Sequence, residues 1–228
     1  MTPVLLAWSG GKDSTLALAE LRRRPTHRVV GLLTTVTEAY DRISMHGVRR
    51  SILRAQSASL ELPVFEAILP PDASNDVYDA AWARAIGRAR DAIGPVEHIA
   101  YGDLFLEDVR RFREEQSVRL DYQPLFPLWG QDTRALARGF VDAGYDAYLT
   151  CVDTQQLDAS FAGRRYDARL LDELPASVDP CGERGEFHTC VVGGPIFSEA
   201  IPVTVGERTR RAERFEYCDL VPSREVRQ

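Results

Sequence analysis

The chain has 228 residues, of which 44% are hydrophobic, and its formal net charge is −6. That length suits one large or two modest domains with a packed core, and the acidic balance argues against broad nonspecific nucleic-acid binding. No apolar stretch approaches the length of a membrane span and no signal-peptide pattern opens the sequence, so we expect a cytoplasmic protein without a membrane partner.

The first two predicted elements enclose a glycine-rich turn. Residues 3–8 (PVLLAW) form an apolar run typical of a buried parallel strand, and residues 14–24 have helical spacing. Between them stands Lys12, the single lysine among 28 basic Lys and Arg residues. Every other basic side chain of this total is an arginine, so a lysine at this one position indicates a role for its compact ammonium. Such a group can place a point charge against a phosphate.

This turn combines backbone N–H groups, the positive end of a helix dipole and two glycines at one place. We therefore predict that it binds a di- or triphosphate through Ser9, Gly10, Gly11, Lys12, Asp13 and Ser14. Asp13 is a candidate helix cap or magnesium ligand. The pattern is neither a Walker A loop nor Gly-x-Gly-x-x-Gly, and the plain alternative is a capped turn without a ligand.

Strands and helices alternate after this turn. We predict strands at residues 28–36, 62–69 and 96–102, with helices at 48–60 and 75–93. Alternation of this kind predicts an α/β protein with a doubly wound parallel sheet, whose ligands bind beyond the carboxyl ends of the strands.

Polar groups and glycines lie at the ends of these strands or on the loop that follows one of them, and we expect them to gather beside the first loop. The candidates are Thr34, Thr35, His46, Gly47, Gly102 and Asp103. Asp103 is suited to ribose hydroxyls or to magnesium, with helix capping as the alternative.

The helix after His46 carries Arg49, Arg50 and Arg54 in its first turns, where cations oppose the helix dipole. A nearby anion such as a triphosphate would explain this placement. The alternative is a solvated basic face with His46 as an ordinary loop residue.

Pro124 and Pro127 indicate a rigid crossing, so we predict a boundary there, with one domain at residues 1–122 that contains the phosphate-binding turn and a second part at 123–228. The second part begins with a helix at 133–143 and a strand at 147–152.

A second polar cluster, residues 180–189, precedes the strand-like residues 190–197 (CVVGGPIF). It contains Glu183, Glu186 and His188 among glycines, which is typical of a binding loop, although a polar turn is the alternative. The four cysteines, Cys151, Cys181, Cys190 and Cys218, form no Cys-x-x-Cys pair, so we expect structural thiols and no zinc or dithiol site.

The first loop resembles the SGGxDS PP-loop of ATP pyrophosphatases. Together, LAWSGGKDS, MHGV, YGDL, PLFPLWG, CGERGEFHT and GGPIF resemble the diphthine-ammonia ligase family, in order and over nearly the whole chain. The resemblance implies a HUP-type PP-loop domain, a smaller C-terminal α/β substrate domain and a short, prokaryotic-type member. One departure is Arg184, where the family usually has asparagine or glycine.

Members of that family adenylate a carboxylate with ATP and Mg²⁺, and ammonia then displaces AMP to form an amide. For this chain the resemblance implies that residues 9–14 bind the pyrophosphate and that Gly102 and Asp103 lie beside the nucleotide. Asp13 and Asp103 stay the candidate magnesium ligands because of their residue type and position. Glu183, Glu186 and His188 would line the substrate pocket. Glu186 or His188 is the expected base.

The acceptor stays open between a small carboxylate and a modified protein, and a homodimer is compatible with the sequence. Three rival functions also stay open. A tRNA thiolase commonly needs a reactive cysteine pair, a sulfonucleotide reductase needs a C-terminal redox cysteine, and a nucleotide sensor would bind ATP without releasing AMP.

Overall fold

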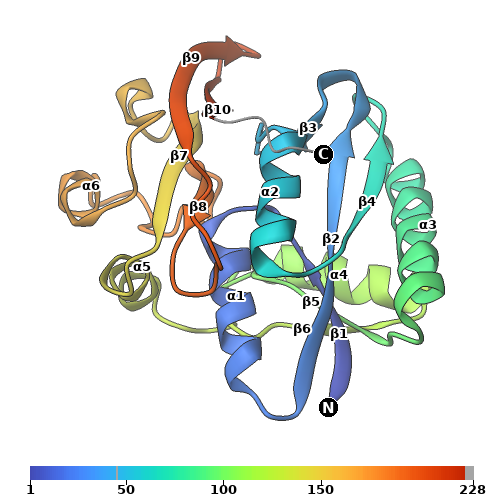
Figure 1. Cartoon of the computed structure of the whole chain (residues 1–228). Helices are drawn as coiled ribbons and strands as arrows, with labels where there is room; N and C mark the ends of the chain where they lie inside the picture. The colour runs from blue at the N-terminus through green and yellow to red at the C-terminus, as the bar shows by residue number, and fades with distance from the viewer. Residues whose placement is uncertain (45, 224–228) are drawn as a thin grey trace.

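The computed structural model describes residues 1–44 and 46–223 and contains two sheets with helices around them (Figure 1). The first sheet has a parallel core in the spatial order β4 (Val64–Leu69), β2 (His27–Thr37), β1 (Thr2–Ala7), β5 (His98–Ala100) and β6 (Gln123–Leu125). A two-residue strand, β3 (Arg42–Ile43), runs antiparallel to the end of β2. The predicted doubly wound, HUP-type α/β sheet is confirmed.

Helices cover both faces of this sheet because its strands are apolar on both sides. One face packs against α1 (Lys12–Arg23) and α2 (Arg50–Leu60), whose buried side chains share a core with the second sheet. The other face packs against α3 (Asn75–Ile93). The helix α4 (Glu107–Leu120) lies on the same side as α3, and Arg119 of α4 pairs with Asp79 of α3.

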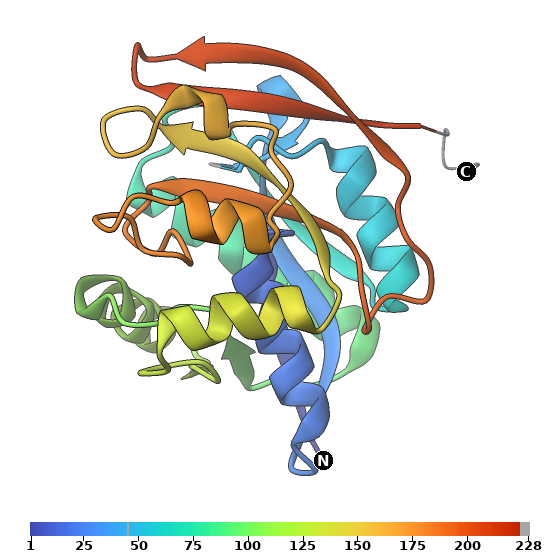
Figure 2. The same ribbon diagram turned by 90° about the vertical axis from the view of Figure 1, so that its left-hand side faces the viewer.

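The second sheet is antiparallel. Its order is β8 (Phe187–Gly193), β7 (Asp146–Asp153), β10 (Phe215–Pro222) and β9 (Val203–Arg211), with α5 (Thr133–Asp142) and α6 (Ala168–Glu173) beside it (Figure 2). Two single-turn 3-10 helices, η1 (Glu38–Tyr40) and η2 (Ala159–Phe161), complete the described elements. This sheet confirms the smaller C-terminal part, although the strand-like residues 190–197 extend beyond β8, which ends at Gly193.

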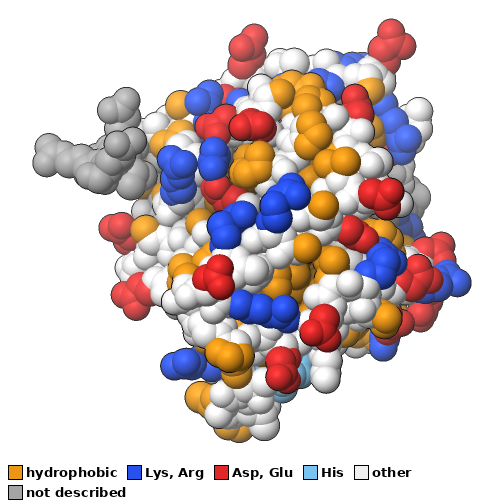
Figure 3. Space-filling model, turned by 90° about the vertical axis from the view of Figure 1, so that its right-hand side faces the viewer, with side chains coloured by type: hydrophobic (Ala, Val, Ile, Leu, Met, Phe, Trp, Pro, Cys, Tyr) orange, Lys and Arg blue, Asp and Glu red, His pale blue; other side chains and the backbone are white. Residues whose placement is uncertain are grey.

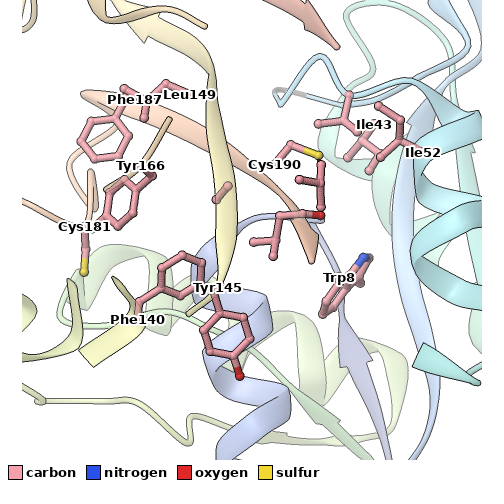
Figure 4. Close-up of a cluster of buried hydrophobic side chains, with 14 of the residues drawn as sticks. Trp8, Ile43, Ile52, Phe140, Tyr145, Leu149, Tyr166, Cys181, Phe187 and Cys190 are labelled. Atoms are coloured by element: carbon pink, nitrogen blue, oxygen red, sulfur yellow. The ribbon is translucent and has the colours of Figure 1, made fainter. Parts of the chain in front are cut away.

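Aromatic rings connect the second sheet with the first loop. Phe140 of α5 stacks on Tyr145 at a centroid distance of 4.7 Å and meets Tyr166 edge-on at 5.6 Å, and Tyr166 lies 6.1 Å from Phe187 of β8 (Figure 4). The Phe187 ring lies 5.8 Å from Nζ of Lys12. The apolar interior therefore extends without a break to the turn after β1.

The division between residues 122 and 123 stays a prediction, and β6, just beyond it, pairs with β5 of the first sheet. Acidic and basic side chains are interspersed on the face shown in Figure 3. Among the described residues, no helix combines the length and hydropathy that a membrane span requires.

Candidate functional site

A cavity of about 340 Å³ lies at the carboxyl ends of β1, β2 and β5, where the strand order reverses. The structure brings most of the predicted residues to its walls: Ser9, Gly11, Lys12, Asp13, Ser14, Thr34, Thr35, His46, Gly102, Asp103, Glu183 and His188. Three predicted residues do not line it: Gly10, Gly47 and Glu186. Most of the polar groups predicted at strand ends therefore do surround the first loop.

The first loop has the backbone shape that an anion-binding turn needs. Gly10 is left-handed with φ +78°, and α1 begins at Lys12 with Gly11 as its extended N-cap. The Ser14 hydroxyl donates a 2.9 Å hydrogen bond to the Gly11 carbonyl. The N-cap residue is Gly11, and the Thr189 hydroxyl accepts the N–H of Lys12 at 3.0 Å, so the alternative of Asp13 as the helix cap is wrong.

Lys12 is 1% exposed and lies where the two halves of the chain meet. Its Nζ donates to the Asp13 carboxylate at 2.7 and 2.9 Å and to the backbone carbonyl of Cys181. Burial lowers the pKa of Lys12, but the attraction of Asp13 outweighs it, so the pKa lies above its ordinary value. The site therefore holds a fixed positive charge.

Two carboxylates lie next to this charge. A Cβ on Gly102 would lie 2.8 Å from the backbone carbon of Asp13, so the turn after β5 contacts the first loop directly. Burial is the main cause that raises the pKa of both Asp13 and Asp103. The charge of Asp179 also raises the pKa of Asp13, and the charge of Asp13 raises the pKa of Asp103. Asp103 does not cap α4, whose N-cap is Leu106.

The close approach at Gly102 leads to a prediction. We expect Gly102→Ala to lower the free energy of unfolding by about 1–3 kcal/mol, because the new methyl group meets backbone atoms that cannot move aside without displacing the loop. Gly87→Ala in α3 is the matched control, because a Cβ there has nothing within 4 Å. It should raise stability by about 0.5–1 kcal/mol. Urea unfolding measures both, and equal effects would contradict the close contact.

Unpartnered polar atoms are concentrated at the cavity. Six buried side-chain nitrogen or oxygen atoms within residues 1–44 and 46–223 have no hydrogen-bond partner, and five of them belong to residues that line it. These five are Thr34 Oγ1, His46 Nδ1, Trp82 Nε1, Asp103 Oδ2 and Arg113 Nε, of which the last two form an ion pair with each other at 3.8 Å. Buried polar groups are normally satisfied, so this concentration indicates a site that is built for a polar ligand.

The C-terminal loop contributes Glu183. Its Oε1 accepts hydrogen bonds from the backbone N–H of Leu104 at 2.8 Å and of Phe105 at 3.4 Å. Burial raises the pKa of Glu183 to about 7, helped by the charges of Asp13 and Asp103. A carboxyl group with that pKa can exchange a proton near neutral pH.

Glu186 takes a different position from the one predicted. It is 1% exposed, and its two oxygens accept the backbone N–H groups of Asp179 and Arg184, each at 2.9 Å. Glu186 therefore fixes the shape of the loop, and the structure does not bring it to the cavity.

His46 and His188 form a pair in the cavity wall, with ring centroids 4.4 Å apart. Burial lowers the pKa of His188 to about 4, and the charge of Lys12 adds to this. The pKa of His46 also lies well below 6.5 through burial and through His188 and Lys12. Both rings are therefore neutral at neutral pH.

The lowered histidine pKa values lead to a second prediction. Between pH 6.5 and about 4, His188 is protonated in the unfolded chain but stays neutral in the folded chain. This residue therefore lowers the free energy of unfolding as the pH falls through that window. We expect His188→Gln to lose less stability than the wild type between pH 7 and pH 5. Urea unfolding at both pH values tests this, and an unchanged difference between the two proteins would contradict it.

The interpretation of the arginines after His46 is corrected by the structure. Arg49 pairs with Asp219 at 2.5 Å, and Arg50 pairs with Glu66 and, at 3.4 Å, with Asp41. The anions that balance these two cations are carboxylates of the protein itself, so Arg49 and Arg50 give no support for a triphosphate.

All four cysteines are buried and free. Burial raises the pKa of Cys181 and of Cys190 to about 12, and that of Cys151 to about 11. These thiols are protonated at neutral pH, which argues against a thiolase that depends on a reactive cysteine.

Sequence reasoning missed part of the cavity wall. Trp8, Tyr78, Trp82, Tyr101 and Arg113 line it but were not predicted as site residues. Trp82 and Tyr101 are almost completely buried, and in the sequence their apolar spacing fits an ordinary core. Only the three-dimensional structure, which places them in the cavity wall, distinguishes these residues from ordinary core residues.

Comparison with known proteins gives matches to one group. Residues 132–225 match the family described as Diphthamide synthase C-terminal domain. The diphthine--ammonia ligase of Schizosaccharomyces pombe is 25% identical over 214 residues, covering 86% of this chain and 35% of that protein. The diphthine--ammonia ligases of Homo sapiens and Danio rerio are 30% and 31% identical over 122 and 119 residues, covering 49% of this chain and 44% and 46% of those proteins. The chain thus spans less than half the length of these curated relatives.

Proposed function

We propose that the chain, which is similar to diphthine--ammonia ligases, is a member of that family and an ATP-dependent ligase that forms a carbon–nitrogen bond. In this proposal ATP adenylates a carboxylate, releasing pyrophosphate, and ammonia then displaces AMP to give an amide. The observation that carries the proposal is Lys12, a buried lysine held at a helix N-terminus in a cavity lined by unpartnered polar atoms.

The terminal phosphates of ATP would bind at the first loop. In this proposal the N–H groups at the start of α1 and the Lys12 ammonium direct positive charge toward the same place. Both would stabilise the negative charge that develops as pyrophosphate leaves. Lys12 is held by the Cys181 carbonyl, so the C-terminal half takes part in positioning it. In this proposal residues 1–122 supply the nucleotide site and residues 123–228 complete it from the substrate side.

Asp13 and Asp103 fit a magnesium ion. Their carboxylates interact electrostatically, and Asp103 Oδ2 is buried without a hydrogen-bond partner, which matches the hard oxygen ligands that Mg²⁺ uses beside phosphates. When bound there, Mg²⁺ would neutralise charge on the phosphates. Within the described part of the chain no cluster of three or more His, Cys, Asp or Glu could hold a metal by itself, so ATP oxygens would complete the coordination.

Glu183 is the residue best placed to move a proton. Its carboxyl group lines the cavity, and its pKa of about 7 lets it accept a proton from ammonium at neutral pH. His188 lines the same wall and is neutral, so it can accept a hydrogen bond or a proton transiently. Glu186 is left out of the proposed mechanism because both of its oxygens are bound to backbone N–H groups.

The acceptor is proposed to be a carboxylate, either a small molecule or a modified protein side chain. The relatives are named for diphthine, and a diphthine-bearing elongation factor is therefore the first acceptor to test. We further propose a cytoplasmic enzyme whose substrates are ATP and ammonium.

The experiment supplies MgATP and ¹⁵N-ammonium with a panel of carboxylates, diphthine-bearing elongation factor 2 and a fractionated cell extract, and follows ¹⁵N by mass spectrometry. We expect the isotope to enter one acceptor as an amide, only when ATP is present. Release of AMP without ¹⁵N incorporation into any acceptor would contradict the ligase and favour an enzyme that transfers another group to an adenylated substrate.

A further inference from the structure

We propose that Gln56 is a positioning residue that sets the geometry of the nucleotide-binding loop by connecting it to β8 of the second sheet. This inference rests on the proposed function, because it concerns the loop that would bind ATP. Gln56 lies in α2, is completely buried and does not line the cavity itself.

The Gln56 carboxamide joins three separate segments. Its Nε2 donates to the Gly10 carbonyl at 3.0 Å and to the Val191 carbonyl at 2.7 Å, while its Oε1 accepts from the Trp8 indole Nε1 at 2.9 Å. Gly10 belongs to the first loop, Trp8 lines the cavity, and Val191 belongs to β8. One side chain therefore fixes the loop, a wall of the cavity and the second sheet relative to each other.

Gln56 also packs against the loop backbone. A Cβ on Gly10 would lie 2.8 Å from Gln56 Oε1. Gly10 makes this contact with a left-handed φ of +78°. The carboxamide thus occupies the space that a side chain at residue 10 would need. It fills that space with a polar group that satisfies the loop carbonyl.

Further hydrogen bonds hold β8 to the same loop. The Val191 N–H donates to the Gly10 carbonyl at 2.8 Å, and the Lys12 N–H donates to Thr189 Oγ1 at 3.0 Å. The second bond occupies the N–H of Lys12, the first residue of α1, so β8 is attached directly to the end of the helix that would bind the phosphates. A shift of β8 would therefore move the groups that would contact the phosphates.

The chemistry of the carboxamide explains why this position suits glutamine. The group must donate two hydrogen bonds to carbonyl oxygens and accept one from an indole, and an uncharged primary amide does all three. A carboxylate would face two carbonyl oxygens and be repelled, whereas a protonated carboxylic acid could still donate one bond. A methionine would fill the space and leave both carbonyls without the amide donor.

The test measures MgATP affinity by isothermal titration calorimetry for the wild type, Gln56→Met and Gln56→Glu at about pH 6 and about pH 8. We expect Gln56→Met to bind about tenfold more weakly at both pH values, because about 1–1.5 kcal/mol of positioning is lost. Gln56→Glu should bind about tenfold more weakly at pH 8 and recover most of this at pH 6, since the two carbonyls raise the pKa of the new carboxyl group and protonation removes the repulsion.

Gln116 provides a matched control. It is also a fully buried glutamine, and its carboxamide contacts Asp79 at 2.7 Å and Tyr122 at 3.1 Å, neither of which lines the cavity. We expect Gln116→Met to lose stability on thermal unfolding while its MgATP affinity stays within about twofold of the wild type.

A merely structural role for Gln56 would make the two sites behave alike. Wild-type affinity in folded Gln56→Met, an equal loss in Gln116→Met, or a loss in Gln56→Glu that does not depend on pH would each overturn the inference. A wild-type protein that does not bind MgATP would instead overturn the proposed function, and the inference with it.

Discussion

Replacement of Lys12 by alanine is expected to lower ATP-dependent AMP release by about 10²–10³-fold, the usual effect of removing one preorganised group that stabilises developing negative charge. The change removes the ammonium that contacts Asp13 and the Cys181 carbonyl, and it leaves the half-buried Asp13 carboxylate without its cation. The measurement is AMP release from MgATP with ammonium and the acceptor found by the isotope experiment.

Lys12→Arg is the informative companion variant. A planar guanidinium keeps the charge but is larger than an ammonium, and Lys12 is 1% exposed, so the site has little space for it. We expect this variant to stay strongly impaired. A Lys12→Ala protein that folds, as judged by thermal unfolding, and releases AMP at the wild-type rate would contradict the role of Lys12.

Glu183→Gln is expected to remove the pH dependence of the reaction near neutrality and to lower the rate by about 10²–10⁴-fold at pH 8. The pKa of Glu183 is raised to about 7 mainly by burial. Below that pH the carboxyl group is protonated and cannot take a proton from ammonium, so the wild-type rate should rise as the pH passes upward through about 7. The pH profile of amide formation measures this.

Glu186→Gln is the matched control for Glu183→Gln. Both residues lie on the same loop, but Glu186 binds the backbone N–H groups of Asp179 and Arg184 and does not line the cavity. We expect Glu186→Gln to lose stability and to keep the inflection near pH 7. If Glu186→Gln loses the inflection and Glu183→Gln keeps it, the base is Glu186, one of the two candidates that the sequence predicted.

The parallel sheet could be predicted because its signals are strong. The apolar run at residues 3–8 became β1 at Thr2–Ala7, and the helix predicted at 75–93 became α3 with the same bounds. Two elements gave no such signal. Most residues of β9 are exposed on both faces, and α4 buries only Gln116 and Ser117 among its fourteen residues, so neither shows a clear apolar period.

The site was predictable where its residues follow strands and less so where a loop decides orientation. The first loop follows β1, Thr35 lies near the carboxyl end of β2, and Gly102 and Asp103 follow β5. Parallel strands bring their carboxyl ends to one edge. Glu183 and Glu186 are three residues apart, and the left-handed glycines Gly182 and Gly185, at φ +68° and +82°, turn one carboxylate toward the cavity and the other away. Sequence spacing does not encode that choice. Similarly, Asp219 lies 170 residues from the Arg49 that it pairs with.

The measurement that tests the adenylation claim most directly is ³¹P NMR of the products formed from MgATP, ammonium and the acceptor. The account predicts AMP and pyrophosphate in equal amounts, formed only when the acceptor is present. ADP and phosphate as products would contradict adenylation, and tight binding of ATP with no cleavage under any condition would make the protein a nucleotide sensor.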